Sequence, residues 1–375
     1  MSEPETRLRI LQVCRADPGG SGVLACELAE GLHRHGHEVH LCAARRPLRL
    51  RADSAVTLHE AGFAETEPDF AVLLAVRLAD LVDRLGIDVL HVHYAWPFAV
   101  SAALALGWTR RRPASVTTLH GTDVSQVDPS RAPALGWALG RADVVTAVSS
   151  WLGALALSSV PGAPAPRLIP DFVDRRRFHA DGRRGPPADG AWRLLHAGNF
   201  RPVKRPLDAV EVFARVHARF PRSRLVLAGE GPLLPRVLAR AQALGLGPAV
   251  EVRGTVADMP ALYRTCDLAL VTSASESFSL VALEAQACGV PVVGTITGGL
   301  PEVVEAGVGG ELRPVGDVAG LADAALALLS DPRILAAYGR RAAATAPARF
   351  DAERTLAAWT ATYVEARARY DRAHG

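Results

Sequence analysis

Residues 271–303 read VTSASESFSLVALEAQACGVPVVGTITGGLPEV, and this stretch decides the fold. An apolar, strand-like run ends at Ser275, and an Ala/Leu helical pattern then runs to Gly289. Glu276 is predicted at the mouth of this strand-to-helix loop. Glu284 follows eight positions later, about two turns along and on roughly the same face of the helix. The pattern predicts an α/β unit with two carboxylates beyond the carboxyl end of a strand.

The backbone amides at the start of this helix are predicted to bind a phosphate. Phe278, Ser279 and Leu280 place their N–H groups at the helix N-terminus, where the helix dipole favours an anion. A carboxylate beside a phosphate is unfavourable unless it has another ligand, and sugar hydroxyls suit it. Two acids here therefore indicate a nucleotide-sugar site rather than a nucleotide hydrolase. Solvated acids on an amphipathic helix are the simpler alternative.

The motif E-S-F-x-L-V-x-L-E-A-x-A-C-G-x-P-V-V, followed by G-G-L-P-E-V-V, resembles the donor-site signature of the retaining glycosyltransferases of family 4. The resemblance implies the GT-B architecture: an α/β fold of two Rossmann-like, doubly wound domains with a cleft between them and a C-terminal crossover helix. It also implies a UDP- or GDP-sugar donor and no metal or other cofactor. Under it, Glu276 holds the 3- and 4-hydroxyls of the sugar, and Glu284 holds the ribose.

Length and composition agree with two domains. The 375 residues exceed what one core usually serves, and a hydrophobic content of 49% is ample for two. Strand and helix patterns alternate in both halves. We expect an N-terminal acceptor-binding domain over residues 1–168 and a C-terminal nucleotide-sugar domain over residues 169–349. A helix over about residues 350–375 is expected to pack back on the first domain.

Charge and cysteine content narrow the function further. A net charge of +3 gives no case for nucleic acid as a partner. The N-terminus is polar, and no apolar run reaches membrane-spanning length. The five cysteines lack C-x-x-C spacing, so we expect reduced, buried thiols and a cytoplasmic protein. The sequence leaves open whether the chain forms a homodimer.

The segment GNFRPVKR, residues 198–205, predicts cations at the carboxyl end of a strand. Lys204 is the only lysine among 42 basic residues, and Arg201 lies close to it in sequence. Two fixed cations there would stabilise the charge that develops on a departing diphosphate. Many family 4 enzymes carry arginine where this chain has Asn199, which leaves Arg201 as a substitute. A solvated basic loop is the alternative.

Glycine-rich turns supply the other expected donor contacts. The first half opens with strand, G-G-S-G turn and helix, which is either a tight turn only or, as the resemblance implies, a loop that meets the donor through Gly20 and Ser21. In the second half, Gly231 follows a strand. The resemblance places the uracil against Thr255 and Val256.

Histidines at the ends of two strands have different expected roles. The resemblance implies that His120, in VTTLHGTDVS, contacts the donor sugar near its anomeric carbon; a packed structural histidine is the alternative. His91 and His93 form an i, i+2 pair in HVHYAWP, but no third ligand has useful spacing, so no metal site is expected.

Aromatic residues after the same strand are expected on the acceptor side. Tyr94, Trp96 and Phe98 stand at its mouth, although a place in the core is an equal alternative. The full expected acceptor set is Ser21, Tyr94, Trp96, Phe98, Thr118 and Thr122.

Within family 4, the segments HGHEVHLC, HVHYAWPF, HGTDVS and NFRPVKR resemble the enzymes that join N-acetylglucosamine from UDP-N-acetylglucosamine to L-malate in bacillithiol biosynthesis. Departures cluster in the N-terminal half, at Trp96 and Phe98 among others; Ser279 for glycine is an exception. The pattern suggests the same donor and another acceptor. We favour an aromatic amine or hydroxybenzoate, free or bound to an acyl carrier protein, as in glucosaminyltransferases of mitomycin-type antibiotic pathways. L-Malate is the close alternative; a nucleotide-sugar epimerase and a non-catalytic sugar-nucleotide binder are distant ones.

Overall fold

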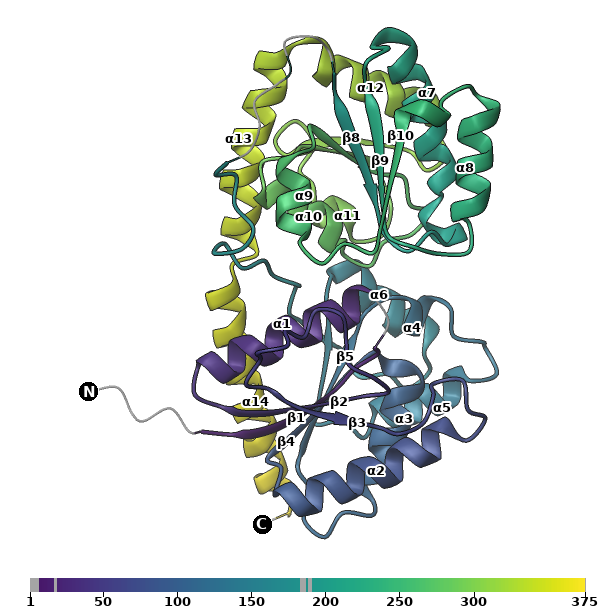
Figure 1. Ribbon diagram of the computed structural model, residues 1–375. Helices are drawn as coiled ribbons and strands as arrows, with labels where there is room; N and C mark the ends of the chain where they lie inside the picture. Colours follow the sequence, from purple (N-terminus) through teal and green to yellow (C-terminus); the bar gives the residue numbers. More distant parts are fainter. Residues whose placement is uncertain (1–6, 17–18, 183–186, 188–190, 375) are drawn as a thin grey trace, which may run out of the picture. The chain divides into compact units, whose positions relative to one another are not determined.

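The chain forms two compact α/β units (Figure 1). A computed structural model describes residues 7–16, 19–182, 187 and 191–374. Unit 1 comprises the chain up to Asp171 together with the chain from Glu353 onward, and unit 2 comprises Phe172–Ala352. Both limits lie slightly after the boundaries that we expected, at residues 168 and 349.

Unit 1 is built on a seven-stranded parallel sheet in the order β3-β2-β1-β4-β5-β6-β7. The strands are β1 (Arg9–Val13), β2 (Glu38–Ala43), β3 (Thr57–Glu60), β4 (Val89–His93), β5 (Ala114–Leu119), β6 (Val144–Ala147) and β7 (Arg167–Leu168). The helices are α1 (Gly20–Arg34), α2 (Phe70–Leu85), α3 (Ala95–Leu106), α4 (Thr122–Ser125), α5 (Ala132–Leu139), α6 (Ser150–Ser159) and α14 (Ala352–His374). The strand order reverses between β1 and β4, and the carboxyl ends at such a switch point are where open α/β sheets bind ligands.

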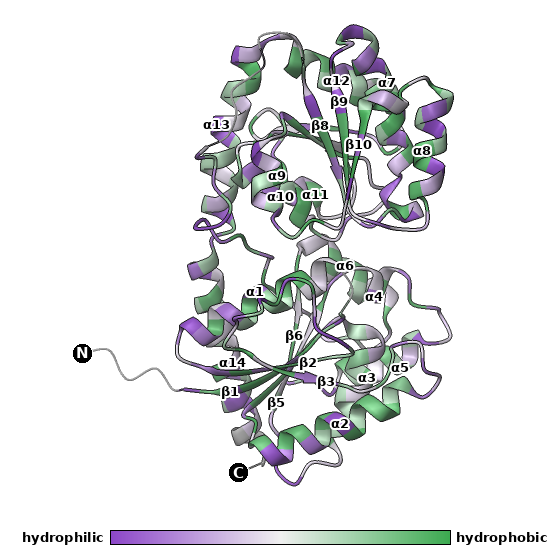
Figure 2. Cartoon of the chain, in the orientation of Figure 1, coloured by the Kyte–Doolittle hydropathy of each residue, from purple (hydrophilic) through white to green (hydrophobic). Residues whose placement is uncertain are grey.

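Helix α2 shows how the apolar pattern sets these elements. Phe70, Leu74, Leu78 and Leu81 recur at helical spacing and are all buried. Gly86 follows with a left-handed φ of 62° and ends the helix. The apolar and polar faces of α2 are visible as green and purple stripes (Figure 2). The apolar spacing and the terminal glycine therefore set the extent of this helix.

Helix α14 packs against unit 1 although it is the last element of the chain. The Tyr363 hydroxyl lies 2.7 Å from Nδ1 of His91 in β4. Arg167 Nη1 donates to the Thr362 hydroxyl over 2.9 Å. A Cβ placed on Gly31 of α1 would lie 2.5 Å from a methyl group of Leu356, so that glycine permits the close approach of the two helices.

Unit 2 has a six-stranded parallel sheet in the order β10-β9-β8-β11-β12-β13, with its switch point between β8 and β11. The strands are β8 (Arg193–Ala197), β9 (Arg224–Ala228), β10 (Val250–Gly254), β11 (Leu268–Val271), β12 (Val292–Thr295) and β13 (Gly310–Arg313). The α-helices are α7 (Pro206–Arg219), α8 (Leu234–Ala243), α9 (Met259–Arg264), α10 (Leu280–Ala287), α11 (Leu300–Val303), α12 (Val318–Ser330) and α13 (Pro332–Arg349); the short 3₁₀ helices are η1 (Pro202–Lys204) and η2 (Gly247–Ala249).

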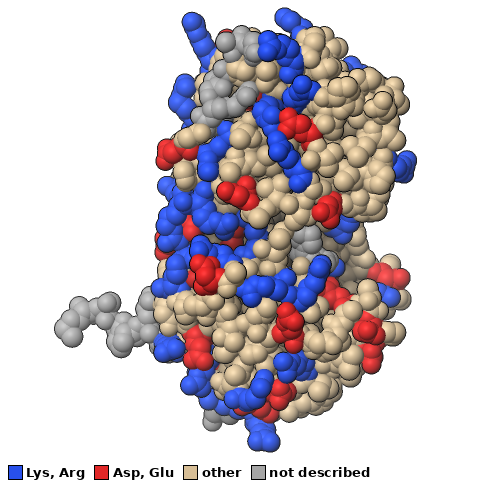
Figure 3. Space-filling model, viewed as in Figure 1, with Lys and Arg blue, Asp and Glu red and all other residues tan. Residues whose placement is uncertain are grey.

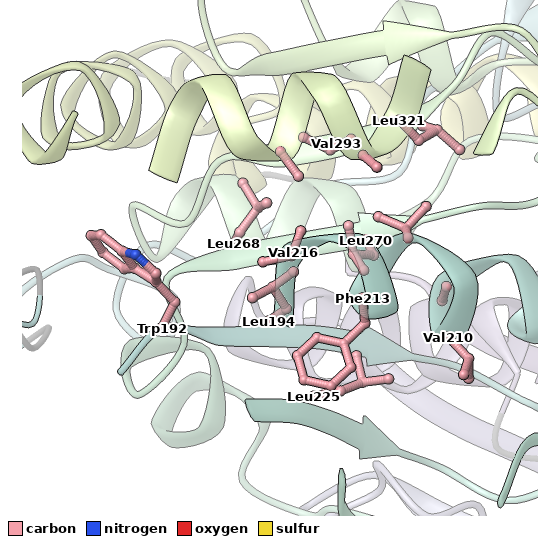
Figure 4. Close-up of a cluster of buried hydrophobic side chains, with 14 of the residues drawn as sticks. Trp192, Leu194, Val210, Phe213, Val216, Leu225, Leu268, Leu270, Val293 and Leu321 are labelled. Carbon is pink, nitrogen blue, oxygen red and sulfur yellow. The ribbon is translucent and has the colours of Figure 1, made fainter. Parts of the chain in front are cut away.

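The core of unit 2 lies between this sheet and the helices α7 and α12. Phe213 and Val216 of α7 point onto Leu194 and Leu225 of the sheet, and Leu321 of α12 belongs to the same cluster (Figure 4). Full burial of each such side chain contributes about 1.5–3 kcal/mol. This rigid layer fixes the strands whose carboxyl ends carry the candidate site.

Positively and negatively charged side chains both occur on the surface. On the face seen in Figure 3, basic side chains are numerous and acidic ones lie between them. Across the ranges that the structure describes, no helix is both long enough and apolar enough to cross a membrane. All five cysteines are buried, and none of them forms a disulfide bond.

Candidate functional site

Two loops meet at the switch point of unit 2. One follows β8 and contains η1; the other follows β11 and leads into α10. The Ala274 amide donates to the Val203 carbonyl over 2.7 Å. The Thr272 hydroxyl donates to the carbonyls of Lys204 and Arg205 over 3.2 and 3.0 Å. These bonds bring the predicted cation loop and the predicted acid loop together.

Lys204 and Glu276 form an ion pair at this junction. The Lys204 ammonium donates to both Glu276 oxygens, over 2.8 and 3.0 Å, and the Ser273 hydroxyl donates to Oε1 over 2.7 Å. The Glu276 side chain is 8% exposed and that of Lys204 is 25% exposed. An ammonium has three donors and a carboxylate about four acceptor positions, so each group retains capacity for a ligand.

The loop after β12 holds the Glu276 backbone. Gly299 N donates to the Glu276 carbonyl over 2.8 Å. Gly298 has a φ of +54°, and a Cβ there would lie 1.9 Å from the same carbonyl oxygen. Glycine at the second turn of the motif therefore allows the chain to pass close to the Glu276 backbone.

Helix α10 begins at Leu280, so Glu276 lies in the loop before it, as predicted. The prediction that Glu276 shares a helical face with Glu284 is wrong, because only Glu284 lies on the helix. Glu284 is buried, and the Tyr263 hydroxyl donates to its Oε2 over 2.9 Å. The amides of Leu280 and Val281, before the capped amide of Ala282, have no acceptor within the helix, which leaves them available to an anion. The Phe278 ring is buried against Phe350, so only its backbone is available to a ligand.

Ser279 caps α10 in a strained conformation. Its φ is 94°, and its hydroxyl accepts from Ala282 N over 3.4 Å. A left-handed conformation costs a residue with a side chain roughly 1–2 kcal/mol, whereas replacing a serine cap by glycine costs a few tenths. We expect Ser279→Gly to stabilise unit 2 by up to about 1 kcal/mol in urea unfolding. Ser277→Gly, in the same loop without a positive φ, is the control and should destabilise by roughly 0.5–1 kcal/mol. Destabilisation by Ser279→Gly would contradict the strain argument.

Arg201, the other predicted cation, is hydrogen-bonded to Asn199. The Asn199 amide oxygen, in the orientation that satisfies both groups, accepts from Arg201 Nε and Nη2 over 3.2 and 3.0 Å. Gly231 packs on the same loop, because a Cβ there would lie 2.5 Å from Phe200 N. Gly231 is therefore explained by packing alone, and its contact with the donor stays a prediction.

The predicted uracil residues lie beyond the edge strand β10. Thr255 is exposed and Val256 is half-buried. The Thr255 hydroxyl donates to Glu230 Oε1 over 3.0 Å. Glu230 follows β9, so the ends of two adjacent strands contribute to this surface.

His196 is a neighbour of the ion pair that the sequence reasoning missed. It is buried in β8 and its Nδ1 donates to the Leu270 carbonyl over 3.1 Å, which leaves Nε2 as an acceptor. Burial, opposed in part by that hydrogen bond, lowers the pKa of His196 to about 4; the charge of Lys204 also lowers it. Its place two residues before Gly198, at the end of a predicted strand, was the available signal.

In unit 1, the histidines form a buried polar chain under α14. His91 Nε2 lies 2.7 Å from the Thr118 hydroxyl, which lies 2.8 Å from that of Thr146. Nδ1 of His93 lies 3.2 Å from Nε2 of His120. Burial lowers the pKa of His120 to about 3 and those of His91 and His93 well below the usual value. Thr118 is fully buried in this chain, so its predicted contact with the acceptor is wrong.

The three aromatic residues after β4 lie in different surroundings. Phe98 is buried in the core against Phe70, with ring centroids 5.5 Å apart, so its assignment to the acceptor site is wrong. Tyr94 is half-buried, and its hydroxyl lies 2.7 Å from that of Thr122. Trp96 is half-buried. Only Tyr94 and Trp96 keep surface for a ligand.

Two arginines cover these rings. The Arg15 guanidinium lies 4.8 Å from the Tyr94 ring centre, and that of Arg131 lies 5.7 Å from the Trp96 ring centre. Cations over aromatic faces are mutually stabilising. Arg15 also forms an ion pair with Glu65, with its Nε 3.2 Å from a carboxylate oxygen. The mouth of β4 therefore carries charged groups as well as aromatic rings.

The remaining predicted contacts of unit 1 lie at the start of α1. Gly20 is exposed and Ser21 half-buried, in the first turn of that helix after β1. Of the residues with described placement, no three His, Cys, Asp or Glu side chains are grouped so as to hold a metal ion. The site residues thus fall into two sets, one at the switch point of each unit.

Comparisons with known proteins assign both halves of the chain. Residues 18–177 match the family model described as Glycosyltransferase Family 4, and residues 191–331 match the model described as Glycosyl transferases group 1. The N-acetyl-alpha-D-glucosaminyl L-malate synthase of Bacillus anthracis is 35% identical over 371 residues, which cover 96% of this chain and 97% of that protein. A D-inositol 3-phosphate glycosyltransferase of Geodermatophilus obscurus is 34% identical over 74% of this chain and 66% of that protein.

Solved structures share the fold. The crystal structure of Anabaena Alr3699/HepE in complex with UDP and glucose superposes with a TM-score of 0.81 at 21% identity, covering 95% of this chain and 99% of that one. Sucrose-phosphate synthase from Thermosynechococcus elongatus superposes with a TM-score of 0.79 at 23% identity, covering 96% and 99% of the two chains. At such identities the likeness concerns the fold alone.

Proposed function

Because the chain belongs to the glycosyltransferases of family 4, with the GT-B fold, we propose that it transfers N-acetylglucosamine from UDP-N-acetylglucosamine to a small hydroxy acid, with L-malate as the first candidate. The observation that carries the proposal is the identity of 35% with an N-acetylglucosaminyl L-malate synthase over nearly the full length of both chains. The donor site is the junction of the loops after β8 and β11, with Lys204, Glu276 and the first amides of α10.

The chemistry of the donor site follows from its charges. The acceptor hydroxyl oxygen bonds to the anomeric carbon while the bond from that carbon to the diphosphate oxygen breaks. The departing phosphate oxygen takes the acceptor proton, and UDP leaves. The third donor of the Lys204 ammonium and the free amides of α10 stabilise the charge on that oxygen. Glu276 fixes Lys204 and uses its remaining lone pair for a sugar hydroxyl. We propose that the anomeric configuration is retained, as in the family.

Malate is preferred to the aromatic acceptor that we first favoured for two reasons. Phe98 is in the core, which removes one of the three rings on which that preference rested. The other two rings, Tyr94 and Trp96, each have a guanidinium group over one face, from Arg15 and Arg131, and that face is not open to a stacking aromatic acceptor.

A competition assay tests the acceptor. UDP-N-acetylglucosamine is offered with L-malate, an aminohydroxybenzoate and D-inositol 3-phosphate together, and the products are identified by mass spectrometry. We expect glycosylated malate as the main product. Transfer to the aromatic compound instead would restore the first interpretation, and transfer to inositol phosphate would place the chain with its second group of relatives.

Activity is expected to be independent of divalent cations. A lysine and helix amides neutralise a diphosphate without a metal bridge, and the sequence has no Asp-x-Asp motif. UDP release should therefore be the same with and without EDTA. Loss of activity in EDTA that Mg²⁺ or Mn²⁺ restores would refute this proposal.

A further inference from the structure

One buried carboxylate joins the loops that follow β4 and β5 in unit 1. Asp123 is 1% exposed. Its Oδ2 accepts from Ala95 N over 2.6 Å, and its Oδ1 accepts from Gly121 N over 2.6 Å. His120 N lies 3.1 Å from both oxygens. Three amides from two separate loops thus converge on a single side chain.

Neither of the helices that begin here has a side-chain cap of its own. Helix α3 starts after Tyr94, whose φ is 84°, and α4 starts after Gly121, whose φ is 134°. The first amides of a helix need external acceptors, and a left-handed residue is held only by its surroundings. Asp123 supplies the acceptor for the first amide of α3 from the neighbouring helix.

The two loops carry two residues of the expected acceptor set, Tyr94 and Thr122, and also His120, for which we expect a contact with the donor sugar. Tyr94 lies directly before Ala95, and His120 lies directly before Gly121. The Tyr94 hydroxyl also meets the Thr122 hydroxyl at 2.7 Å, one residue before Asp123. The relative placement of Tyr94, Thr122 and His120 is therefore set by the same carboxylate.

We propose that Asp123 is a positioning residue for sugar transfer: without touching either substrate, it holds Tyr94 and Thr122 in register with His120. This inference rests on the proposed function. Its chemistry requires two acceptor oxygens. In Asp123→Asn, one of them becomes an NH₂ group that faces backbone N–H donors, so one loop is released although the volume is unchanged.

Asp143 provides a matched control. It also accepts a backbone amide and a hydroxyl, those of Ser115, each over 2.8 Å. Ser115 lies at the amino end of β5, at the opposite edge of the sheet from the site. Asp143→Asn should therefore lower the stability of unit 1 without changing the geometry of the two loops.

Steady-state kinetics with UDP-N-acetylglucosamine and L-malate separate the two roles. For Asp123→Asn we expect kcat/KM for malate to fall about 10-fold or more, because small displacements of positioning groups are costly. The Kd for UDP, a ligand of unit 2, should stay unchanged. Asp143→Asn should keep wild-type values of both. Wild-type kinetics for folded Asp123→Asn overturn the proposal.

A measurement without turnover covers the case in which the wild-type chain transfers no sugar to malate. That outcome counts against the proposed acceptor, and hydrogen exchange then tests whether Asp123 holds the two loops together. Amides of residues 95, 120 and 121 should exchange faster in Asp123→Asn than in both the wild type and Asp143→Asn. Unchanged exchange at these amides overturns the proposal that Asp123 holds the two loops.

Discussion

Lys204→Ala is expected to lower kcat/KM for UDP-N-acetylglucosamine by about 100-fold or more, because removing one preorganised donor to a developing oxyanion typically costs that much. The Lys204 side chain is 25% exposed and lies outside the core, so the variant should fold. The chain offers no other lysine as a substitute. UDP release at saturating acceptor measures the effect, and circular dichroism checks the fold.

Two controls separate charge from stability in this experiment. Removing Lys204 leaves the Glu276 carboxylate buried without its cation, which is itself unfavourable. Lys204→Ala combined with Glu276→Gln removes that penalty and should be equally inactive. Arg253→Ala removes an exposed cation of β10 and should keep full activity. Near wild-type turnover of a folded Lys204→Ala protein would mean that the diphosphate binds elsewhere.

Acidification from pH 7 to pH 5 is expected to destabilise both units through their buried neutral histidines, by about 2 kcal/mol for each histidine. In unit 1, burial raises the pKa of Asp171 to about 8, and its protonation offsets part of this loss. His91, His93 and His120 in unit 1, and His196 in unit 2, are held neutral by burial, with lowered pKa values. In the unfolded chain they titrate near pH 6.5. Below that pH the unfolded state binds more protons than the folded state, so each histidine costs about 2 kcal/mol at pH 5.

Urea unfolding at the two pH values, followed by hydrogen exchange in peptides of each unit, measures this difference. Stability should be highest above about pH 6.5 and fall towards the folded-state pKa values. A domain has only about 5–15 kcal/mol in total, so unit 1 should unfold first. No loss of stability in either unit would show that these histidines are accessible to protons in the folded state.

The fold was predictable because its signals are local and repeated. Short apolar runs marked the buried parallel strands, since such strands are apolar on both faces. The short edge strand β3 lacks this signal because its burial is partial, with the pattern exposed at both ends. Strand β13, with only Gly310 fully buried, lacks it for the same reason.

Site residues that directly follow strand ends were predictable from the sequence. Residues whose position depends on side-chain packing were not. Lys204 and Glu276 followed from the rule that ligands bind beyond the carboxyl ends of strands. Phe98 and Thr118 obey the same rule in sequence, yet their side chains turn into the interior. The bond from Ala95 N to Asp123 joins residues 28 apart, and no spacing reveals such a bond.

The most direct test of the central claim is the product formed from UDP-N-acetylglucosamine and L-malate, followed by proton NMR. We expect one equivalent of UDP for each equivalent of N-acetylglucosaminyl malate, with the α configuration of the donor kept at the anomeric carbon. A β-linked product would contradict retention. Absence of UDP release with any of the three acceptors would contradict the assignment as a UDP-sugar-dependent transferase with these acceptors.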